Sequence, residues 1–206
     1  MTDDTNRRSF LAWVIFGLGA IFSAIIGVPL ACYFIDPRHR KGPKSSLKLV
    51  DGVKLDELAL NTPKQGVLRD TRTDGWTLYP NDVIGRVWAV QVGARPAGLN
   101  TAEKVKEFNA QPMAAKQAFV FVFTTICPHL GCFVNLNDRG NGFACPCHSA
   151  TFNLDGDRAN ATNPAKRGMD TLDWEIDMDD PDFNRIKVKY EKFKTLEEAK
   201  IPLGGA

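Results

Sequence analysis

The feature that most constrains this 206-residue chain is a dense group of cysteines and histidines. Two short motifs, CPHLGC at 127–132 and CPCHSATF at 145–152, hold four of the five cysteines and two of the three histidines. The candidate metal ligands are Cys127, His129, Cys132, Cys145, Cys147 and His148. A tetrahedral zinc site needs only four such ligands, and two disulfides would use the cysteines alone. Zinc, two disulfides and an iron–sulfur cluster with mixed ligands are the three alternatives.

The N-terminal part of the chain contains an uncharged apolar run. Residues 10–35 read FLAWVIFGLGAIFSAIIGVPLACYFI, and a membrane-spanning helix needs about 20 apolar residues. No small-residue cleavage site of the A-x-A kind follows the run. We therefore expect residues 10–35 to be a retained transmembrane anchor in contact with membrane lipid.

The charges around this run give two opposite predictions of its orientation. Arg7 and Arg8, followed by SFL, resemble a twin-arginine export signal in a cytoplasmic N-terminus, residues 1–9. The positive-inside rule alone favours the reverse orientation, because five basic residues flank the far end of the run. These are Arg38, Arg40, Lys41, Lys44 and Lys48. We give the export signal precedence, because the cysteine chemistry requires an oxidising compartment. The expected location is a bacterial inner membrane, with the C-terminal domain on the periplasmic side.

The rest of the chain is predicted to be a linker and a β domain. Residues 36–52 are polar and basic with two prolines and two glycines, which is typical of a linker or hinge. From residue 53 to 206 the sequence predicts a mainly β, antiparallel domain with one helix, at 102–108 after Thr101. The predicted strands are Val83–Val92, Ala118–Thr125, Phe133–Leu136, Gly142–Ala144, Thr151–Leu154, Trp174–Met178 and Arg185–Tyr190. The net charge of +2, without a basic face interleaved with aromatic residues, suggests no nucleic-acid partner.

The motifs CPHLGC and CPCH resemble the two cluster loops of Rieske iron–sulfur proteins, in particular the subunit of cytochrome bc complexes. The resemblance implies a Rieske-type antiparallel β-sandwich with an inserted cluster-binding subdomain at about 124–165. It also implies one 2Fe–2S cluster, with two cysteines on one iron and two histidines on the other. The implied ligands are Cys127, Cys145, His129 and His148. Cys132 and Cys147 would form a disulfide between the loops, and Pro164 would lie in a loop that covers the cluster.

The same resemblance implies an electron-transfer subunit of a quinol–cytochrome c reductase, an oxidoreductase that is not catalytic as a single chain. Its partners would be cytochrome b and a c-type cytochrome. His148 would hydrogen-bond the quinol and accept its hydrogen, with His129 as the secondary partner. Imidazole ligands raise the cluster potential into the range of about −150 to +300 mV.

Two positions depart from the family pattern. High-potential members carry a serine two places after the second histidine and a tyrosine two places further on, and both hydroxyls donate to cluster sulfurs. This chain has Ala150 and Phe152 there, which predicts a lower potential and a low-potential donor such as menaquinol. The hydroxyl of Ser149 or Thr151 could replace a missing donor.

Three other functions compete with this one. The small Rieske subunit of an arsenite oxidase-type periplasmic molybdoenzyme would carry the same cluster without meeting quinol. A dioxygenase needs two more histidines and a carboxylate for a mononuclear iron, and only His39 remains. A structural zinc domain is the alternative without redox chemistry.

Overall fold

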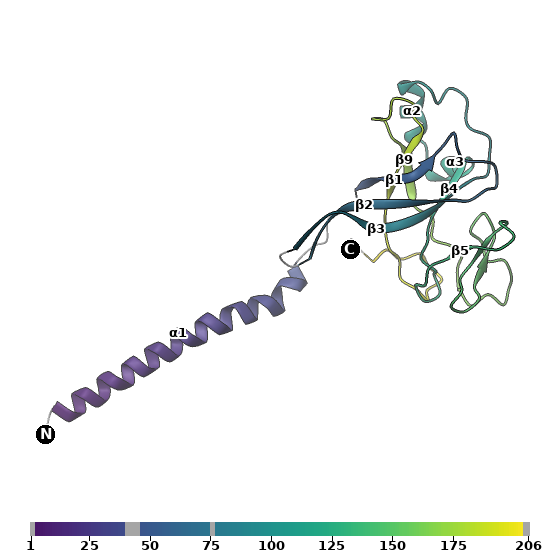
Figure 1. Cartoon of the computed structure of the whole chain (residues 1–206). Coiled ribbons are helices and arrows are strands. Elements are labelled where there is room, and N and C mark those ends of the chain that lie inside the picture. The colour runs from purple at the N-terminus through teal and green to yellow at the C-terminus, as the bar shows by residue number, and fades with distance from the viewer. Residues whose placement is uncertain (1–2, 40–45, 75–76, 204–206) are drawn as a thin grey trace. The chain divides into compact units, whose positions relative to one another are not determined.

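A computed structural model describes residues 3–39, 46–74 and 77–203 of the chain (Figure 1). Side chains of residues 3–5, 36–39 and 74 are outside this description. The chain divides into two compact units, Met1–Gly42 and Pro43–Ala206.

The first unit is the single helix α1, Asp3–His39. Every described side chain from Asn6 to Ile35 is exposed, and this stretch is long and apolar enough to cross a membrane once. The helix contains the predicted anchor and extends beyond both of its ends. Of the predicted linker, residues 36–39 continue the helix, residues 40–45 lie outside the described residues, and residues 47–52 form a strand.

The second unit is built on a six-stranded antiparallel sheet in the order β4-β3-β2-β1-β9-β8. Its strands are β1 Leu47–Lys54, β2 Lys64–Asp74, β3 Thr77–Gln91, β4 Val120–Thr124, β8 Asp173–Ile176 and β9 Arg185–Lys189. The two edges of the sheet are joined, because Leu172 N–H donates to Val122 O at 2.7 Å and Thr124 N–H donates to Asp170 O at 2.9 Å. The predicted mainly β, antiparallel fold is confirmed. The two layers expected of a sandwich are parts of one continuous sheet, which curls nearly into a barrel.

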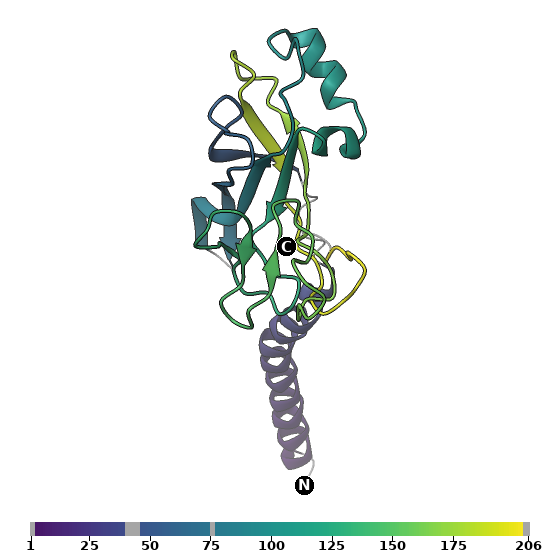
Figure 2. The ribbon, with the colours of Figure 1, turned by 90° about the vertical axis from the view of Figure 1, so that its right-hand side faces the viewer.

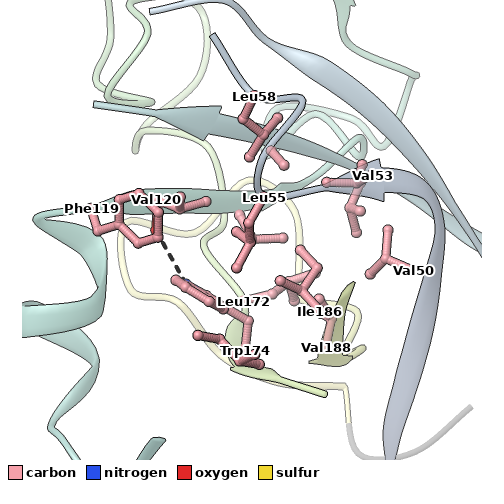
Figure 3. Close-up of a cluster of buried hydrophobic side chains, with 14 of the residues drawn as sticks. Val50, Val53, Leu55, Leu58, Phe119, Val120, Leu172, Trp174, Ile186 and Val188 are labelled. Atoms are coloured by element: carbon pink, nitrogen blue, oxygen red, sulfur yellow. Dashed lines mark hydrogen bonds between the residues drawn. The ribbon is translucent and has the colours of Figure 1, made fainter. Parts of the chain in front are cut away.

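The main core fills the inside of this curled sheet (Figure 3). Trp174 is fully buried at its centre, and its indole N–H donates to Val120 O at 3.2 Å, the dashed line in the figure. Val50 and Val53 of β1 pack into the same core. Their burial explains why strand structure begins at Leu47, before the predicted domain boundary at residue 53.

A second core lies on the other face of β3 and β4. Val87 and Ala89 of β3 belong to the main core, whereas Trp88 and Val90 belong to the second. Successive side chains of a strand point to opposite faces, so both faces of β3 are buried at 87–90, which explains the apolar sequence VWAV there. The second core is covered by a three-stranded sheet in the order β5-β6-β7, seen beside the large sheet in Figure 1. These strands are β5 Asn135–Leu136, β6 Phe143–Ala144 and β7 Thr151–Phe152.

Two short helices connect β3 to β4. The predicted helix is confirmed as α2, Ala102–Asn109, with Thr101 at its N-cap position but without a side-chain capping hydrogen bond. A second helix, α3 Met113–Gln117, follows Pro112 and was not predicted. Proline is favoured at helix starts, so Pro112 is the local signal that the sequence analysis missed.

Candidate metal centre

Two loops of matching geometry form the candidate site. The first loop, 127–132, follows β4, and the second, 145–150, joins β6 to β7. In each loop the amide of the first cysteine donates to the carbonyl five residues later, at 2.8 Å. These pairs are Cys127 with Cys132 and Cys145 with Ala150. Each loop therefore contains the same type of turn, which positions its side chains.

The fifth residue of each loop has left-handed backbone. Gly131 has φ 80° and Ser149 has φ 58°. Glycine adopts this conformation without steric cost, whereas a residue with a Cβ is strained there. Ser149 thus takes the backbone position that Gly131 takes in the first loop.

A disulfide between Cys132 and Cys147 joins the two loops, as the resemblance implied, with Cα atoms 6.6 Å apart. The sulfur of Cys145 lies within 4.8 Å of both disulfide sulfurs. Since two of the four cysteines are bonded to each other, a zinc site made of the four loop cysteines is excluded. The alternative of two disulfides is not realised, because Cys127 and Cys145 are free thiols.

These two free thiols are buried and hydrogen-bonded to each other. Burial is the main cause that raises the pKa of the Cys127 thiol, to about 11. The backbone amides of His129 and Leu130 donate to the same sulfur and oppose this rise. A metal that binds here must displace a proton, and the two amides are placed to stabilise the resulting thiolate.

The two histidines of the loops lie next to each other. Their rings meet edge to face with centroids 4.8 Å apart, His129 half-buried and His148 exposed. The Nδ1 atom of His129 is buried without a hydrogen-bond partner among the described residues. A buried ring nitrogen without a partner is costly, and a metal bond removes that cost. Two thiols and two adjacent imidazoles are the donor set of a 2Fe–2S cluster with mixed ligands.

The residues after the second histidine offer no hydroxyl toward the second core. Ala150 and Phe152 are fully buried there, 0% and 1% exposed. Thr151 precedes Phe152 on β7, so its side chain points to the opposite face of this strand, and its hydroxyl accepts a hydrogen bond from Asn160 Nδ2 at 3.2 Å. Ser149 is exposed.

The loop that contains Pro164 is attached to the same strand. Pro164 is half-buried, and the buried Asn163 before it donates its side-chain amide to Thr151 O. The amide of Ala165 donates to Asn163 Oδ1 at 3.0 Å. The covering role of Pro164 stays a prediction.

The C-terminal residues beside the first loop have no signal in the sequence. Leu196 N–H donates to Pro128 O at 3.0 Å, and Arg167 binds the backbone around Leu196. No local pattern could have revealed these contacts, because their partners are about 30 or more residues apart in the sequence.

The class of protein follows from this geometry and from a match to a known family. Residues 99–174 match the family described as Rieske [2Fe-2S] domain. This matched segment includes both cysteine–histidine loops, so the candidate site is similar to that of a Rieske domain, the class of domain that binds a 2Fe–2S cluster.

Three known proteins that are similar to this chain carry names of iron–sulfur or Rieske proteins. The chain is 26% identical over 164 residues to the menaquinol:cytochrome c reductase iron–sulfur subunit of Bacillus subtilis (strain 168), covering 78% of this chain and 81% of that protein. It is 24% identical over 163 residues to the cytochrome b6-f complex iron–sulfur subunit of Chlorobaculum thiosulfatiphilum, covering 78% and 66%. A cyanobacterial plasma membrane Rieske protein from Synechocystis PCC 6803 gives a TM-score of 0.33 at 20% identity, covering 60% and 86%. The chain is thus similar to iron–sulfur subunits of menaquinol:cytochrome c reductase and cytochrome b6-f complexes.

Proposed function

We propose that this chain is the electron-transfer subunit of a membrane quinol–cytochrome c reductase. It takes one electron from menaquinol and passes it to a c-type cytochrome. The observation that carries the proposal is the exposed His148 beside the half-buried His129, next to two buried thiols. The name of the Bacillus subtilis relative supports menaquinol as the donor.

We assign the ligands residue by residue. Cys127 and Cys145 hold one iron as thiolates, and His129 and His148 hold the other as neutral imidazoles. The buried Nδ1 of His129 is its metal-binding atom, because this nitrogen has no other partner among the described residues. The disulfide between Cys132 and Cys147 keeps the two loops together.

His148 is the residue that meets the quinol, because it is the more exposed of the two imidazoles. When bound, the cluster supplies a one-electron acceptor. The His148 ring nitrogen that does not bind iron accepts a hydrogen bond from the quinol hydroxyl. It then takes that proton as the electron leaves the quinol. The added negative charge of a reduced cluster would make the His148 imidazole hold this proton more tightly, which would couple the two transfers. The second electron of the quinol would need a different acceptor, because the cluster takes only one electron at a time.

The preference for menaquinol rests on the surroundings of the second loop. A hydroxyl that donates to a cluster sulfur stabilises the more negative, reduced state and raises the potential. Ala150 and Phe152 have no hydroxyl, and the hydroxyl of Thr151 is on the other face of β7. A lower potential fits a donor that is itself more reducing.

The proposed location is a bacterial inner membrane, with α1 as a single anchor and the Rieske domain on the outer side. The disulfide supports this orientation, because disulfides persist in oxidising compartments. The twin-arginine reading of Arg7 and Arg8 stays a prediction. The arsenite oxidase alternative is not supported by the relatives described above, which are subunits of bc-type and b6-f-type complexes.

A redox titration of the full chain in detergent tests the proposal, with the EPR signal of the reduced cluster as the readout. A Rieske-type signal with a midpoint well below the top of the family range is expected. A midpoint near the upper end, about +300 mV, would overturn the menaquinol assignment. Absence of the signal, with zinc found in its place, would overturn the function as a whole.

A further inference from the structure

We propose that the C-terminal loop, residues 192–203, is part of the cluster site, and that Arg167 is its positioning residue. The loop orients the peptide bond between Pro128 and His129, and this peptide donates a hydrogen bond to the Cys127 sulfur. The inference rests on the proposed role of Cys127 as a cluster ligand and extends it to the groups that set the cluster potential.

The C-terminal loop is closed and anchored at its base. Lys194 N–H donates to Ile201 O at 2.9 Å, and Leu203 N–H donates to Lys192 O at 2.8 Å. Phe193 inserts into the main core with 6% of its surface exposed. Figure 2 shows this loop in yellow beside the green loops of the metal centre.

One peptide bond links the C-terminal loop to the Cys127 sulfur. Its carbonyl, Pro128 O, accepts from Leu196 N–H at 3.0 Å. Its amide, His129 N–H, donates to the sulfur of Cys127. Two hydrogen bonds in series through one peptide polarise each other, so the first strengthens the second.

Arg167 aims the Leu196 amide at this peptide. Its guanidinium donates to Lys194 O at 2.8 Å and to Glu197 O at 2.7 Å, the carbonyls on both sides of Leu196. Leu196 itself has φ 63°, a left-handed conformation that is strained for a leucine and persists only when its surroundings impose it. The two hydrogen bonds from Arg167 hold the backbone of Leu196 in this conformation.

Arg167 is itself fixed by an ion pair. Its Nε and Nη2 each donate to one carboxylate oxygen of Asp170 at 2.8 Å. The side chains of Arg167 and Asp170 are only 10% and 4% exposed. A two-pronged pair of this kind fixes both distance and orientation. The guanidinium therefore connects the segment after Pro164 to the C-terminal loop, and through it to the first cluster loop.

A hydrogen bond to a ligand sulfur stabilises the reduced cluster more than the oxidised one, because the reduced cluster is more negative. Loosening the C-terminal loop is therefore expected to lower the midpoint potential. A purely structural role of Arg167 would lower thermal stability and leave the potential unchanged.

The test compares the double variant Arg167→Gln, Asp170→Asn with the unaltered full chain, both with cluster bound. The double change avoids a buried unpaired charge. The matched control is Arg72→Gln, Asp82→Asn, which removes a more exposed ion pair on the β2–β3 hairpin. The readouts are iron content, the EPR spectrum and the EPR-monitored midpoint potential.

We expect the site variant to keep its iron and to change the ratio of reduced to oxidised cluster at a fixed potential by about threefold to tenfold, where tenfold equals 59 mV for one electron. The control variant should titrate like the unaltered chain. A site variant with full iron content and an unchanged midpoint would overturn the inference.

If the double variant fails to fold, Arg167→Lys gives the answer, because lysine keeps the charge but cannot bind both carbonyls and the carboxylate. An unchanged midpoint in that variant would overturn the inference equally. In both variants the measured quantity is the change in midpoint potential relative to the unaltered chain. The inference can therefore fail while the proposed function stands. Absence of a Rieske signal in the unaltered chain would overturn both.

Discussion

The imidazole rings of His129 and His148 meet edge to face, with centroids 4.8 Å apart, although 19 positions separate them in the sequence. Matching turns place both side chains, and the disulfide between the loops holds the turns together. The two rings differ in exposure, and the proposed function gives them different tasks for that reason. His129 is enclosed, and His148 is open to a partner.

Removing one ligand should remove the cluster. We expect His148→Ala and Cys127→Ser to lose the two irons and the EPR signal, because three ligands leave one iron undercoordinated. Iron analysis and visible absorption measure this loss. His39→Ala, which changes the third histidine, is the control and should keep both irons. A ligand variant with full iron content would refute the assignment at that position.

Adding hydroxyls at the two positions that depart from the family pattern should raise the midpoint potential of the cluster. Ala150→Ser and Phe152→Tyr each introduce a possible donor in the second core. A bond stronger to the reduced cluster by about 1 kcal/mol raises a one-electron potential by roughly 40 mV. The EPR-monitored titration measures the shift, and Phe133→Tyr, at an exposed position, is the control. Equal potentials in all four proteins would show that neither position tunes the cluster.

Removing the disulfide should destabilise the domain. Cys132 and Cys147 are 15 positions apart, and closing a loop of this size contributes about 3 kcal/mol in the chain-entropy model. For the double variant Cys132→Ser, Cys147→Ser, this predicts a Tm lower by roughly 6–12 °C. Calorimetry measures it, with Cys32→Ser, in α1, as the control. An unchanged Tm would mean that the neighbouring hydrogen bonds suffice to hold the loops.

The left-handed residues of the two loops should respond to substitution in opposite directions. Gly131→Ala places a Cβ at φ 80° and should cost about 1 kcal/mol, whereas Ser149→Gly relieves strain at φ 58° and should cost nothing or stabilise slightly. Urea unfolding of both variants checks this. An unchanged midpoint potential in Ser149→Gly would in addition show that its hydroxyl does not donate to the cluster.

A buried lysine makes the stability of the domain depend on pH. Lys116 is 3% exposed and donates to Trp174 O at 3.3 Å. Burial lowers its pKa from 10.5, and the carboxylates of Asp173 and Glu175 oppose this only in part. Between the lowered pKa and 10.5 the unfolded chain binds more protons than the native one, so the contribution of Lys116 to stability rises with pH.

We therefore expect Lys116→Met to raise the free energy of unfolding at pH 7 by roughly 1 kcal/mol, and this gain should shrink as the pH rises toward 10.5. Urea unfolding at pH 7 and pH 10.5 measures both values. Lys106→Met, at an exposed position of α2, should show no gain at either pH. A gain that is independent of pH would contradict the role of charge burial.

The strand segments buried on both faces were predictable, whereas β1 and β2 were not. The second half of β3 and the whole of β4 appear in the sequence as apolar segments because they face two cores. The sequences of β1, LKLVDGVK, and β2, KQGVLRDTRTD, are interrupted by charges and glycine, and most of the second half of β2 is exposed. Their strand structure comes from pairing with neighbours, which a single-sequence pattern does not contain.

The two cysteine–histidine loops could be recognised in the sequence for a different reason. Metal chemistry limits the residue types and their spacing, so the motifs stand out locally. Arg167 and Leu196 had no such signal, since an arginine and a leucine in a polar segment fit many structures. Their place beside the first loop follows from the closure of the C-terminal loop, which only the three-dimensional structure shows.

The position of β1 has a mechanical consequence. In the sequence, β1 is the first strand after the anchor helix, and it is an interior strand of the six-stranded sheet, between β2 and β9. A force directed along β1 would act across hydrogen bonds that run perpendicular to it on both sides. Such a force must shear these bonds together, whereas an edge strand could be peeled off one bond at a time. The anchor is thus joined to the domain through a strand that is held on both sides.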